Sequence, residues 1–168
     1  MKTDCALQPM TIYEPFMPTT DQFIAIKLEL AEIQPEERVF DLGCGDARVL
    51  IQAALDFRAN CIGYEIRPDL FESALKAIRE SGLEQSVKVV RGNFLQADVS
   101  SADVVVLYLS SESIAPLAAK LRSELPTGAR IVCHTFGLPG WIPKKHLRVQ
   151  TAGRHIENVF LYVAGVSA

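Results

Sequence analysis

The segment VFDLGCGDARV, at residues 39–49, constrains the fold more than any other part of this chain. An apolar run at 38–43 has the length of a short buried strand and ends in glycine. A run rich in Ala and Leu at 47–57 follows and predicts a helix. Gly43 and Gly45 allow a sharp backbone turn and the close approach of a ligand. The segment therefore predicts a strand–loop–helix unit that is either a plain tight turn or a nucleotide-type binding loop.

The same alternation of strand and helix continues along the chain. Further strands are predicted at 59–66, 86–92, 102–109 and 129–136, and helices at 16–35, 68–81 and 111–125. The first helix carries the capping-box pattern Thr19-x-x-Gln22 and closes at Pro35, and Pro116 must fall in the first turn or two of the last helix. Apolar runs at 146–152 and 157–165 flank a short GRHI turn, which predicts a terminal antiparallel pair. The pattern indicates an α/β fold, a doubly wound and mostly parallel sheet with helices on both faces.

The cysteines give no sign of a metal site. Cys5, Cys44, Cys61 and Cys133 form no C-x-x-C pair, and no Cys/His cluster has zinc spacing. We therefore predict no bound metal and free thiols in the cytoplasm. Cys61 and Cys133 lie in apolar runs and are expected in the core. No apolar run approaches the length of a membrane span, and the N-terminus lacks the apolar stretch of a signal peptide.

Charge is distributed unevenly along the chain, which has a net charge of −3. Residues 1–119 are strongly acidic, which disfavours a general nucleic-acid surface. Residues 120–168 are basic and include Lys144, Lys145, Arg148 and Arg154. This basic third is either a solvated rim or a surface that meets an acidic partner.

A carboxylate after the second predicted strand narrows the choice of ligand. Glu65 stands 20 residues after Gly45, where a carboxylate can accept hydrogen bonds from both ribose hydroxyls. An NAD fingerprint needs a small residue where Arg48 stands, and a carboxylate at Asp41 would repel a pyrophosphate. An ATP loop needs a lysine that this segment lacks. Asp41 instead suits a ligand that carries a cation, and S-adenosylmethionine has a ribose, a sulfonium, an ammonium and no phosphate.

VFDLGCGDAR closely resembles the first motif of the seven-strand S-adenosylmethionine-dependent methyltransferases. The resemblance covers roughly residues 36–165 and implies the strand order 3-2-1-4-5-7-6 with an antiparallel last strand. It also implies that the loop residues line the methionine end of the cofactor, and these are Asp41, Gly43, Cys44 and Gly45. Glu65, with Ile66 after it, is then expected to hold the ribose.

The adenine site is expected after the third strand, in RGNF. Asn93 offers a carbonyl acceptor for the adenine amino group where the family usually has an acid. Phe94 is expected either over the adenine face or in the core.

A narrower resemblance comes from FMPTTDQFIAIKLELAEIQPEERVFDLGCGDAR, VLYLSSE and HTFGLPGW. These segments look like the small protein-lysine methyltransferases related to the mitochondrial ATP-synthase c-subunit methylating enzyme. Those proteins open with a V-P-T/S segment, and they replace the helix after the fifth strand by a short W-x-P connection. By this resemblance Tyr13, Pro18 and Thr19 form a lid over the methionine end, and Thr19 is also a candidate helix cap. The chain is then one domain at 1–168, with a lid and helix at 1–35 and a Rossmann-like core at 36–168.

The acceptor is expected at the end of the fourth strand, where LYLSSES replaces the N/D-P-P-Y motif of adenine- and glutamine-methylating enzymes. Tyr108, Ser110 and Glu112 are the candidate substrate-facing residues. Tyr108 has the alternative of packing on the next helix, and Glu112 that of a helix N-terminal acid. His134 is expected to be structural, with proton transfer as the alternative.

Two positions depart from the family pattern. Ala47 replaces a usual glycine, and we predict that it begins the helix with a negative φ and leaves cofactor binding intact. Thr135 stands where relatives often carry an acid. The leading hypothesis is an S-adenosylmethionine-dependent methyltransferase that acts on a protein lysine. The alternatives are a small-molecule N- or O-methyltransferase and a non-catalytic module that binds a cofactor or a partner.

Overall fold

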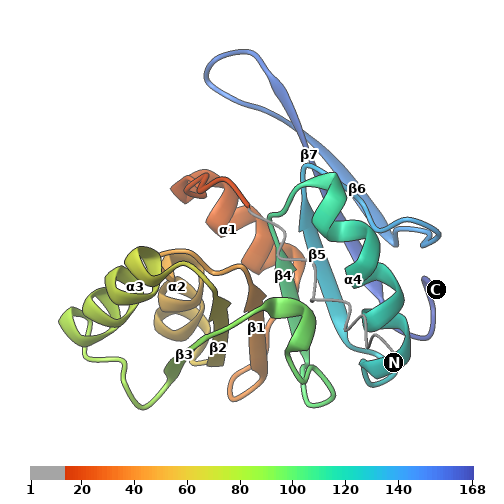
Figure 1. Cartoon of the computed structure of the whole chain (residues 1–168). Helices are drawn as coiled ribbons and strands as arrows, with labels where there is room; N and C mark the ends of the chain where they lie inside the picture. The colour runs from red at the N-terminus through yellow and green to blue at the C-terminus, as the bar shows by residue number, and fades with distance from the viewer. Residues whose placement is uncertain (1–13) are drawn as a thin grey trace, which may run out of the picture.

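The computed structural model describes residues 14–168, so Tyr13 of the predicted lid and Cys5 lie outside the described residues. Its elements alternate between strand and helix up to β5 (Figure 1). The helices are α1 (Asp21–Leu30), α2 (Arg48–Phe57), α3 (Pro68–Glu80), α4 (Ser111–Glu124) and the short 3₁₀ helix η1 (Phe94–Gln96). The strands are β1 (Arg38–Leu42), β2 (Asn60–Glu65), β3 (Val87–Arg91), β4 (Val104–Leu107), β5 (Arg130–His134), β6 (Lys145–Gln150) and β7 (Ile156–Val163).

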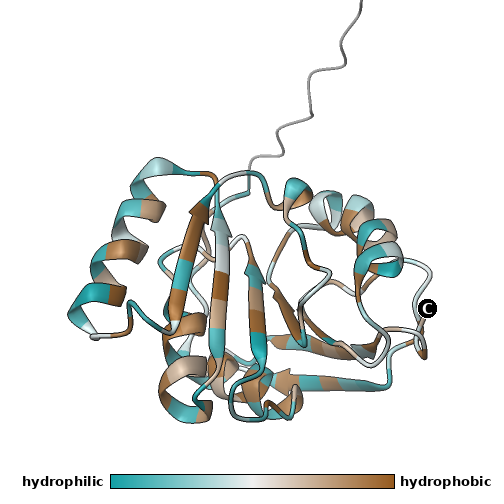
Figure 2. Ribbon diagram, turned by 90° about the horizontal axis from the view of Figure 1, so that it is seen from below, coloured by the Kyte–Doolittle hydropathy of each residue, from teal (hydrophilic) through white to brown (hydrophobic). Residues whose placement is uncertain are grey.

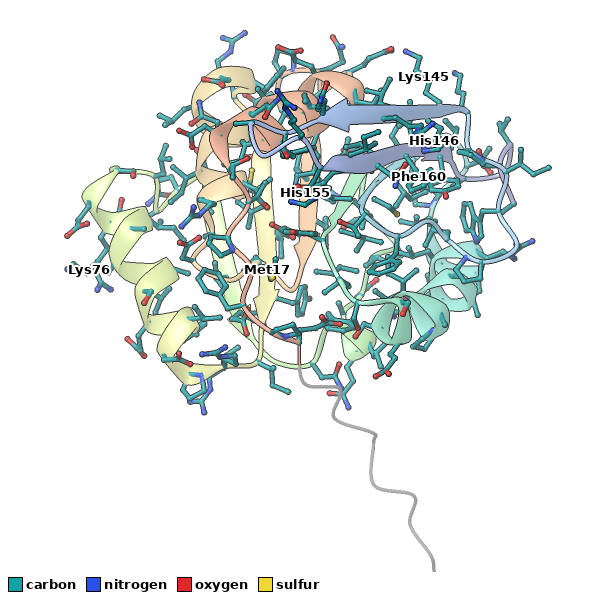
Figure 3. The ribbon with its side chains drawn as sticks, turned by 90° about the horizontal axis from the view of Figure 1, so that it is seen from above. Met17, Lys76, Lys145, His146, His155 and Phe160 are labelled. Carbon is teal, nitrogen blue, oxygen red and sulfur yellow. The ribbon has the colours of Figure 1, made fainter. Side chains whose placement is uncertain are left out.

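The strands form one seven-stranded sheet in the order β3-β2-β1-β4-β5-β7-β6, as predicted. The first five strands are parallel, and β7 runs antiparallel to both of its neighbours, β5 and β6. The predicted terminal pair is the β6–β7 hairpin, and His146 of β6 stacks on Phe160 of β7 with ring centroids 4.3 Å apart (Figure 3). The parallel strands place their carboxyl ends at one edge of the sheet, where doubly wound folds bind ligands.

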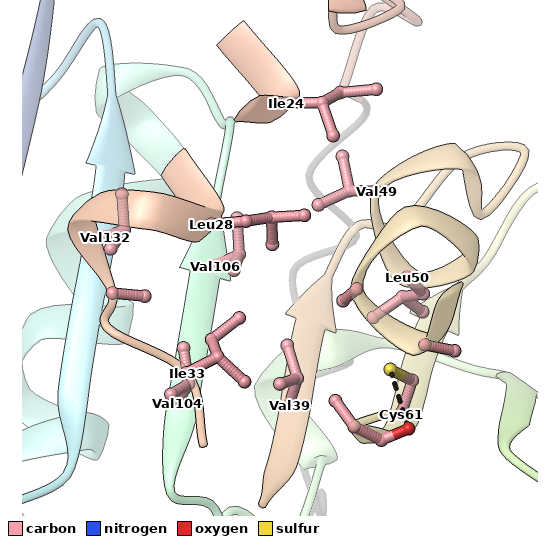
Figure 4. Close-up of a cluster of buried hydrophobic side chains, with 14 of the residues drawn as sticks. Ile24, Leu28, Ile33, Val39, Val49, Leu50, Cys61, Val104, Val106 and Val132 are labelled. Carbon is pink, nitrogen blue, oxygen red and sulfur yellow. Dashed lines mark hydrogen bonds between the residues drawn. The ribbon is translucent and has the colours of Figure 1, made fainter. Parts of the chain in front are cut away.

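Alternation of side chains along the central strands divides the core between the two faces of the sheet. On β4, Val104 and Val106 join the cluster under α1, α2 and α3, which Figure 4 shows, whereas Val105 and Leu107 join the cluster under α4 and η1. Every side chain of this strand is buried. Figure 2 shows the same arrangement from below, with apolar residues along the strands and polar residues on the outer helix surfaces. The central strand β4 is a continuous apolar run because both of its faces are covered.

The first helix is shorter than predicted. It begins after Thr20 and ends at Leu30, whereas the sequence suggested a helix over 16–35. The capping box was also wrong, because the residue at the helix start is Thr20, which makes no side-chain cap. The Thr19 hydroxyl is turned into the interior instead, where it accepts a hydrogen bond from Lys27 Nζ at 3.1 Å.

The connection from β5 to β6 contains no helix, as GLPGWIPKK predicted. Trp141 of this connection is buried, and its Nε1–H donates to the carbonyl oxygen of Ala118 in α4 at 3.3 Å. Pro116 lies inside α4, in its second turn. Cys61 and Cys133 are buried in the two core clusters. In residues 14–168 no helix is long and apolar enough to cross a bilayer, and no group of side chains is arranged to hold a metal ion.

Candidate cofactor and acceptor site

A pocket lies where the loop after β1 meets the end of β2, and we call it the loop pocket. Its lining includes Phe16, Thr19, Lys27, Asp41, Gly43, Cys44, Gly45, Glu65, Ile66, Phe94 and Tyr108. Gly43 and Gly45 have φ of 89° and 57°, in the left-handed region that favours glycine. A Cβ on Gly43 would lie 2.8 Å from Leu109 Cδ2, and one on Gly45 would lie 2.7 Å from Phe16 Cε2. The two glycines therefore let the Leu109 and Phe16 side chains pack directly on the loop backbone, and a side chain at either position would displace these walls of the pocket.

Ala47 corrects the prediction made for the third small residue of this loop. Its φ is +66°, not negative, and it precedes α2 rather than starting it. The Ala47 N–H donates back to the carbonyl oxygen of Cys44 at 3.0 Å, and its own carbonyl oxygen accepts from the Ile51 N–H at 2.9 Å, so a left-handed Ala47 joins the loop turn to α2. A left-handed conformation costs an alanine about 1–2 kcal/mol, which a glycine would avoid. The Ala47 methyl is fully buried in the core, and burying it offsets about 0.8 kcal/mol of that cost.

Glu65 links the loop to the start of α3. Its Oε2 accepts a hydrogen bond from the Gly45 N–H at 3.0 Å, and its Oε1 accepts one from the Arg67 N–H at 2.8 Å. A carboxylate has about four acceptor positions, so both oxygens retain capacity for a ligand. The side chain is 7% exposed and lines the loop pocket. Glu65 thus holds the glycine loop in shape and faces the pocket with the remaining acceptor positions.

Most of the other residues predicted for cofactor binding also reach the loop pocket. Cys44, Thr19, Ile66 and Phe94 line it, and Phe94 is also buried in the core, whereas its place over the adenine face stays a prediction. Asn93 does not line it. The Asn93 side-chain oxygen accepts a hydrogen bond from the Leu95 N–H at 2.9 Å and caps η1, so a local contact uses the acceptor expected at the adenine.

The pocket also contains a buried lysine that the sequence patterns did not single out. Lys27 of α1 is 0% exposed and lines the loop pocket together with Asp41. Burial lowers the pKa of Lys27 to about 8, and the nearby Asp41 carboxylate opposes that decrease. Burial raises the pKa of Asp41 to about 7, the Lys27 ammonium opposes this rise, and the carboxylates of Glu65 and Asp46 add to it. The available signal was that Lys27 falls four residues after Phe23, on the apolar face of the predicted helix.

Replacing Asp41 by Asn is expected to stabilise the protein by an amount that grows between pH 4 and pH 7. The pKa of Asp41 is about 7 in the fold against an ordinary value of 3.8, so between these values the folded state keeps a proton that the unfolded state has lost. Rising pH therefore favours unfolding of the wild type, and Asn does not titrate. Urea unfolding at several pH values measures the difference. An equal change at every pH, or the same trend in Asp56→Asn on the exposed end of α2, would contradict the assignment.

A second pocket, which we call the side pocket, opens beside the first. Its lining includes Glu14, Met17, Tyr108, Ser110, Thr135, Phe136 and Glu157, and Tyr108 borders both pockets. Met17, which Figure 3 labels near the middle of the molecule, is 60% exposed and also borders both. The side pocket therefore combines aromatic and thioether walls with two carboxylates and adjoins the loop pocket.

The structure places two of the three predicted acceptor residues at the side pocket and the third outside both pockets. Tyr108 and Ser110 line the side pocket, and the Ser110 hydroxyl donates to Glu14 Oε1 at 2.7 Å. Glu112 lines neither pocket. It is exposed in the first turn of α4, so the alternative of a helix N-terminal acid is the one that the structure shows.

His134 at the end of β5 is buried between two aromatic rings. Its ring centroid lies 4.4 Å from that of Phe23 and 4.2 Å from that of Tyr108, and both pairs are stacked. Its Nε2 lies 2.5 Å from Glu157 Oε2. Burial lowers the pKa of His134 below its ordinary value, so the ring is neutral near pH 7 and Nε2–H donates to Glu157. His134 thus positions Tyr108 and Glu157, which line the side pocket.

Thr135 introduces backbone strain beside the side pocket. Its φ is +72°, which is rare for a β-branched residue, and strain of this kind is common at functional sites. Thr135→Asn is expected to raise the free energy of unfolding by about 1 kcal/mol, because asparagine tolerates the left-handed region better. Urea unfolding measures the gain. Thr135→Val is the matched variant, since it removes the hydroxyl and keeps the β-branch. An equal gain in that variant would show that the hydroxyl, and not the backbone, was the source of the cost.

Comparison with known proteins gives consistent matches. The model of the ANTKMT methyltransferase domain matches residues 41–145. The chain is 38% identical over 152 residues to a protein-lysine N-methyltransferase of Saccharolobus islandicus, covering 90% of this chain and 94% of that protein. It is 29% identical over 154 residues to the adenine nucleotide translocase lysine N-methyltransferase of Mus musculus, covering 92% of this chain and 65% of that protein.

Among solved structures, the chain resembles one described as an RNA methyltransferase from Salinibacter ruber in complex with S-adenosyl-L-homocysteine. The TM-score is 0.84 at 31% identity, and the match covers 90% of this chain and 96% of that chain.

Proposed function

This chain belongs to the ANTKMT methyltransferase domain family, and we propose that it methylates lysine side chains of a protein with S-adenosylmethionine as the methyl donor. The activity class is that of an S-adenosylmethionine-dependent methyltransferase. One observation carries the choice of acceptor: the 38% identity to a protein-lysine N-methyltransferase extends over nearly the full length of both proteins.

The described residues fit the cofactor. Gly43 and Gly45 expose loop backbone in the pocket, where a Cβ would displace the neighbouring Leu109 or Phe16 side chain, and the Glu65 carboxylate has free acceptor positions for ribose hydroxyls. Asp41 supplies a buried acid near the cationic end expected of the ligand. When bound, S-adenosylmethionine would supply a methyl group for in-line transfer to an amine nitrogen, with S-adenosylhomocysteine as the leaving group.

The side pocket supports an amine acceptor. A lysine must lose its proton before it attacks, and its ordinary pKa is about 10.4. The carboxylates of Glu14 and Glu157 attract the ammonium to the pocket, and Glu157 is a candidate to take its proton. Tyr108 and Phe136 supply apolar walls for the lysine methylenes and exclude water from the amine. These residues act mainly by positioning and desolvating the acceptor.

RNA is the second candidate acceptor, because the Salinibacter ruber structure is described as an RNA methyltransferase. The two carboxylates of the side pocket oppose this choice, since they would repel the phosphates of an RNA strand. The basic residues of the C-terminal third would suit an acidic partner. One of them, Lys145, is already paired with Glu32 of the same chain at 3.2 Å.

Incubation of a native cell extract with methyl-labelled S-adenosylmethionine and this protein tests the proposal. We expect label on protein bands that resists ribonuclease, and N-methyl-lysine after acid hydrolysis. Label that ribonuclease removes supports the RNA acceptor, and label only in small molecules supports the small-molecule alternative. Binding of the cofactor without any transfer supports the non-catalytic module.

Phe136→Ala tests whether the side pocket binds the acceptor, with the labelled protein as the substrate. Phe136 is 43% exposed, so we expect loss of its ring to raise the KM for the acceptor about fivefold, equivalent to about 1 kcal/mol of apolar contact. Affinity for S-adenosylhomocysteine should not change. Ile142→Ala is the control, because Ile142 is 78% exposed and lines neither pocket. Equal kinetics for the two variants would remove the side pocket from the acceptor site.

A further inference from the structure

Lys27 is the buried charged group that the proposed chemistry leaves without a role. Lys27 is carried by α1, is fully buried and lines the loop pocket. It donates to the Thr19 hydroxyl at 3.1 Å and lies 5.4 Å from the centre of the Tyr108 ring. Burial of an ammonium is expensive unless partners replace its water. One neutral hydroxyl and one aromatic face replace only part of that hydration, so the site favours an additional anionic partner.

Asp41 is the nearest candidate for that partner, but it does not neutralise Lys27 by direct contact. Among residues 14–168 no salt bridge joins the two side chains, although each shifts the pKa of the other through space. The pocket therefore presents a buried cation and a buried anion that are near each other but not paired. This arrangement is complementary to a zwitterion, whose carboxylate and ammonium are also close but separate.

We propose that Lys27, oriented by Thr19, binds the α-carboxylate of the methionine end of S-adenosylmethionine, while Asp41 faces its α-ammonium. The carboxylate gives Lys27 the anionic partner that the protein alone does not supply, and such charge-assisted hydrogen bonds are the strong ones. Lys27 is then a specificity residue that separates the intact cofactor from adenosine derivatives without an amino-acid tail. The proposal rests on the cofactor of the family and not on the identity of the acceptor.

Calorimetry with three ligands tests the role of Lys27. S-adenosylmethionine carries both the carboxylate and the ammonium, decarboxylated S-adenosylmethionine lacks only the carboxylate, and 5′-methylthioadenosine lacks the whole amino-acid tail. Lys27→Met keeps a long side chain and is expected to weaken S-adenosylmethionine about 10- to 100-fold, the effect of a hydrogen bond between charged groups. Affinity for the other two ligands should stay within about threefold, or improve for the decarboxylated cation because a like charge is gone.

Two further variants make the pattern specific. Asp41→Asn should weaken both ligands that carry the ammonium and leave 5′-methylthioadenosine unchanged. Lys76→Met, on an exposed lysine of α3 that Figure 3 labels, should change none of the three. Equal losses for S-adenosylmethionine and its decarboxylated form in Lys27→Met would show a structural role for Lys27 and overturn the proposal, and so would no loss at all.

A folding defect in Lys27→Met would be visible in the melting temperature of the free protein. In that case the ligand affinities are measured with Thr19→Val, because this variant removes the hydroxyl that accepts from Lys27 Nζ and keeps the lysine itself. Thr19→Val should weaken the affinity for S-adenosylmethionine about three- to tenfold and leave the affinities for the other two ligands unchanged. No acceptor takes part in these measurements, so a wrong assignment of protein lysine leaves their outcome unchanged.

Discussion

Glu65→Ala is expected to weaken binding of S-adenosylmethionine about 10- to 100-fold. The side chain accepts hydrogen bonds from the Gly45 and Arg67 N–H groups and faces the loop pocket, so alanine removes both the support of the loop and the ribose acceptor. Hydrogen bonds to a charged group contribute about 1.5–3 kcal/mol each. Calorimetry of the variant measures the loss. Glu80→Ala, at the exposed end of α3, is the control and should bind as the wild type does.

The two roles of Glu65 can be separated by changing the ligand. The 2′-deoxyribose form of S-adenosylhomocysteine lacks one hydroxyl that the carboxylate is expected to bind. If the ribose contact exists, Glu65→Ala loses less affinity for this ligand than for S-adenosylhomocysteine itself. Equal losses for both ligands would leave Glu65 as a support of the loop alone, and unchanged affinity for both would remove it from the site.

Gly63→Ala is expected to lower the free energy of unfolding by about 1–3 kcal/mol, the usual cost of overpacking a tight interior. Gly63 pairs with Asp41 across β1 and β2, and a Cβ on it would lie 2.5 Å from Cys44 Sγ and 2.7 Å from Leu50 Cδ1. The loop and α2 would have to move away from the sheet. Urea unfolding followed by the fluorescence of the single tryptophan, Trp141, measures the change.

Cys44→Ala provides the rescue for Gly63→Ala. It removes the sulfur that the new methyl would meet, so the double variant should be more stable than the sum of the single changes predicts. Gly92→Ala is the matched control at the end of the next strand, because no atom lies within 4 Å of its would-be Cβ and its φ is not left-handed. Strict additivity in the double variant would contradict the packing of Cys44 on Gly63.

The order of elements was readable from the sequence because it depends on local signals. Continuous apolar runs predicted β1, β2, β4 and β5, and the strand–glycine–helix pattern placed Gly43, Gly45 and Glu65 at one edge of the sheet. The ends of elements were less certain. The first helix lost the residues before Thr20, and β5 ended at His134 rather than 136, where Thr135 turns into the left-handed region.

The sequence by itself determined the alternation of strands and helices and the glycine loop with its following acid, because periodicity and turn chemistry act over a few residues, whereas the strand order came from the family resemblance. Only the structure showed the positive φ at Ala47, whose methyl is fully buried in the core at the junction of the loop and α2. It also decided the burial of Lys27 beside Asp41, since α1 and β1 meet only when the sheet is covered. Glu157 reaches the side pocket from β7 in the same way, because that strand inserts between β5 and β6. The contacts of Lys27 and Glu157 join residues distant in the chain, and although helical spacing places Lys27 on the apolar face of α1, no local pattern encodes Asp41 as its neighbour.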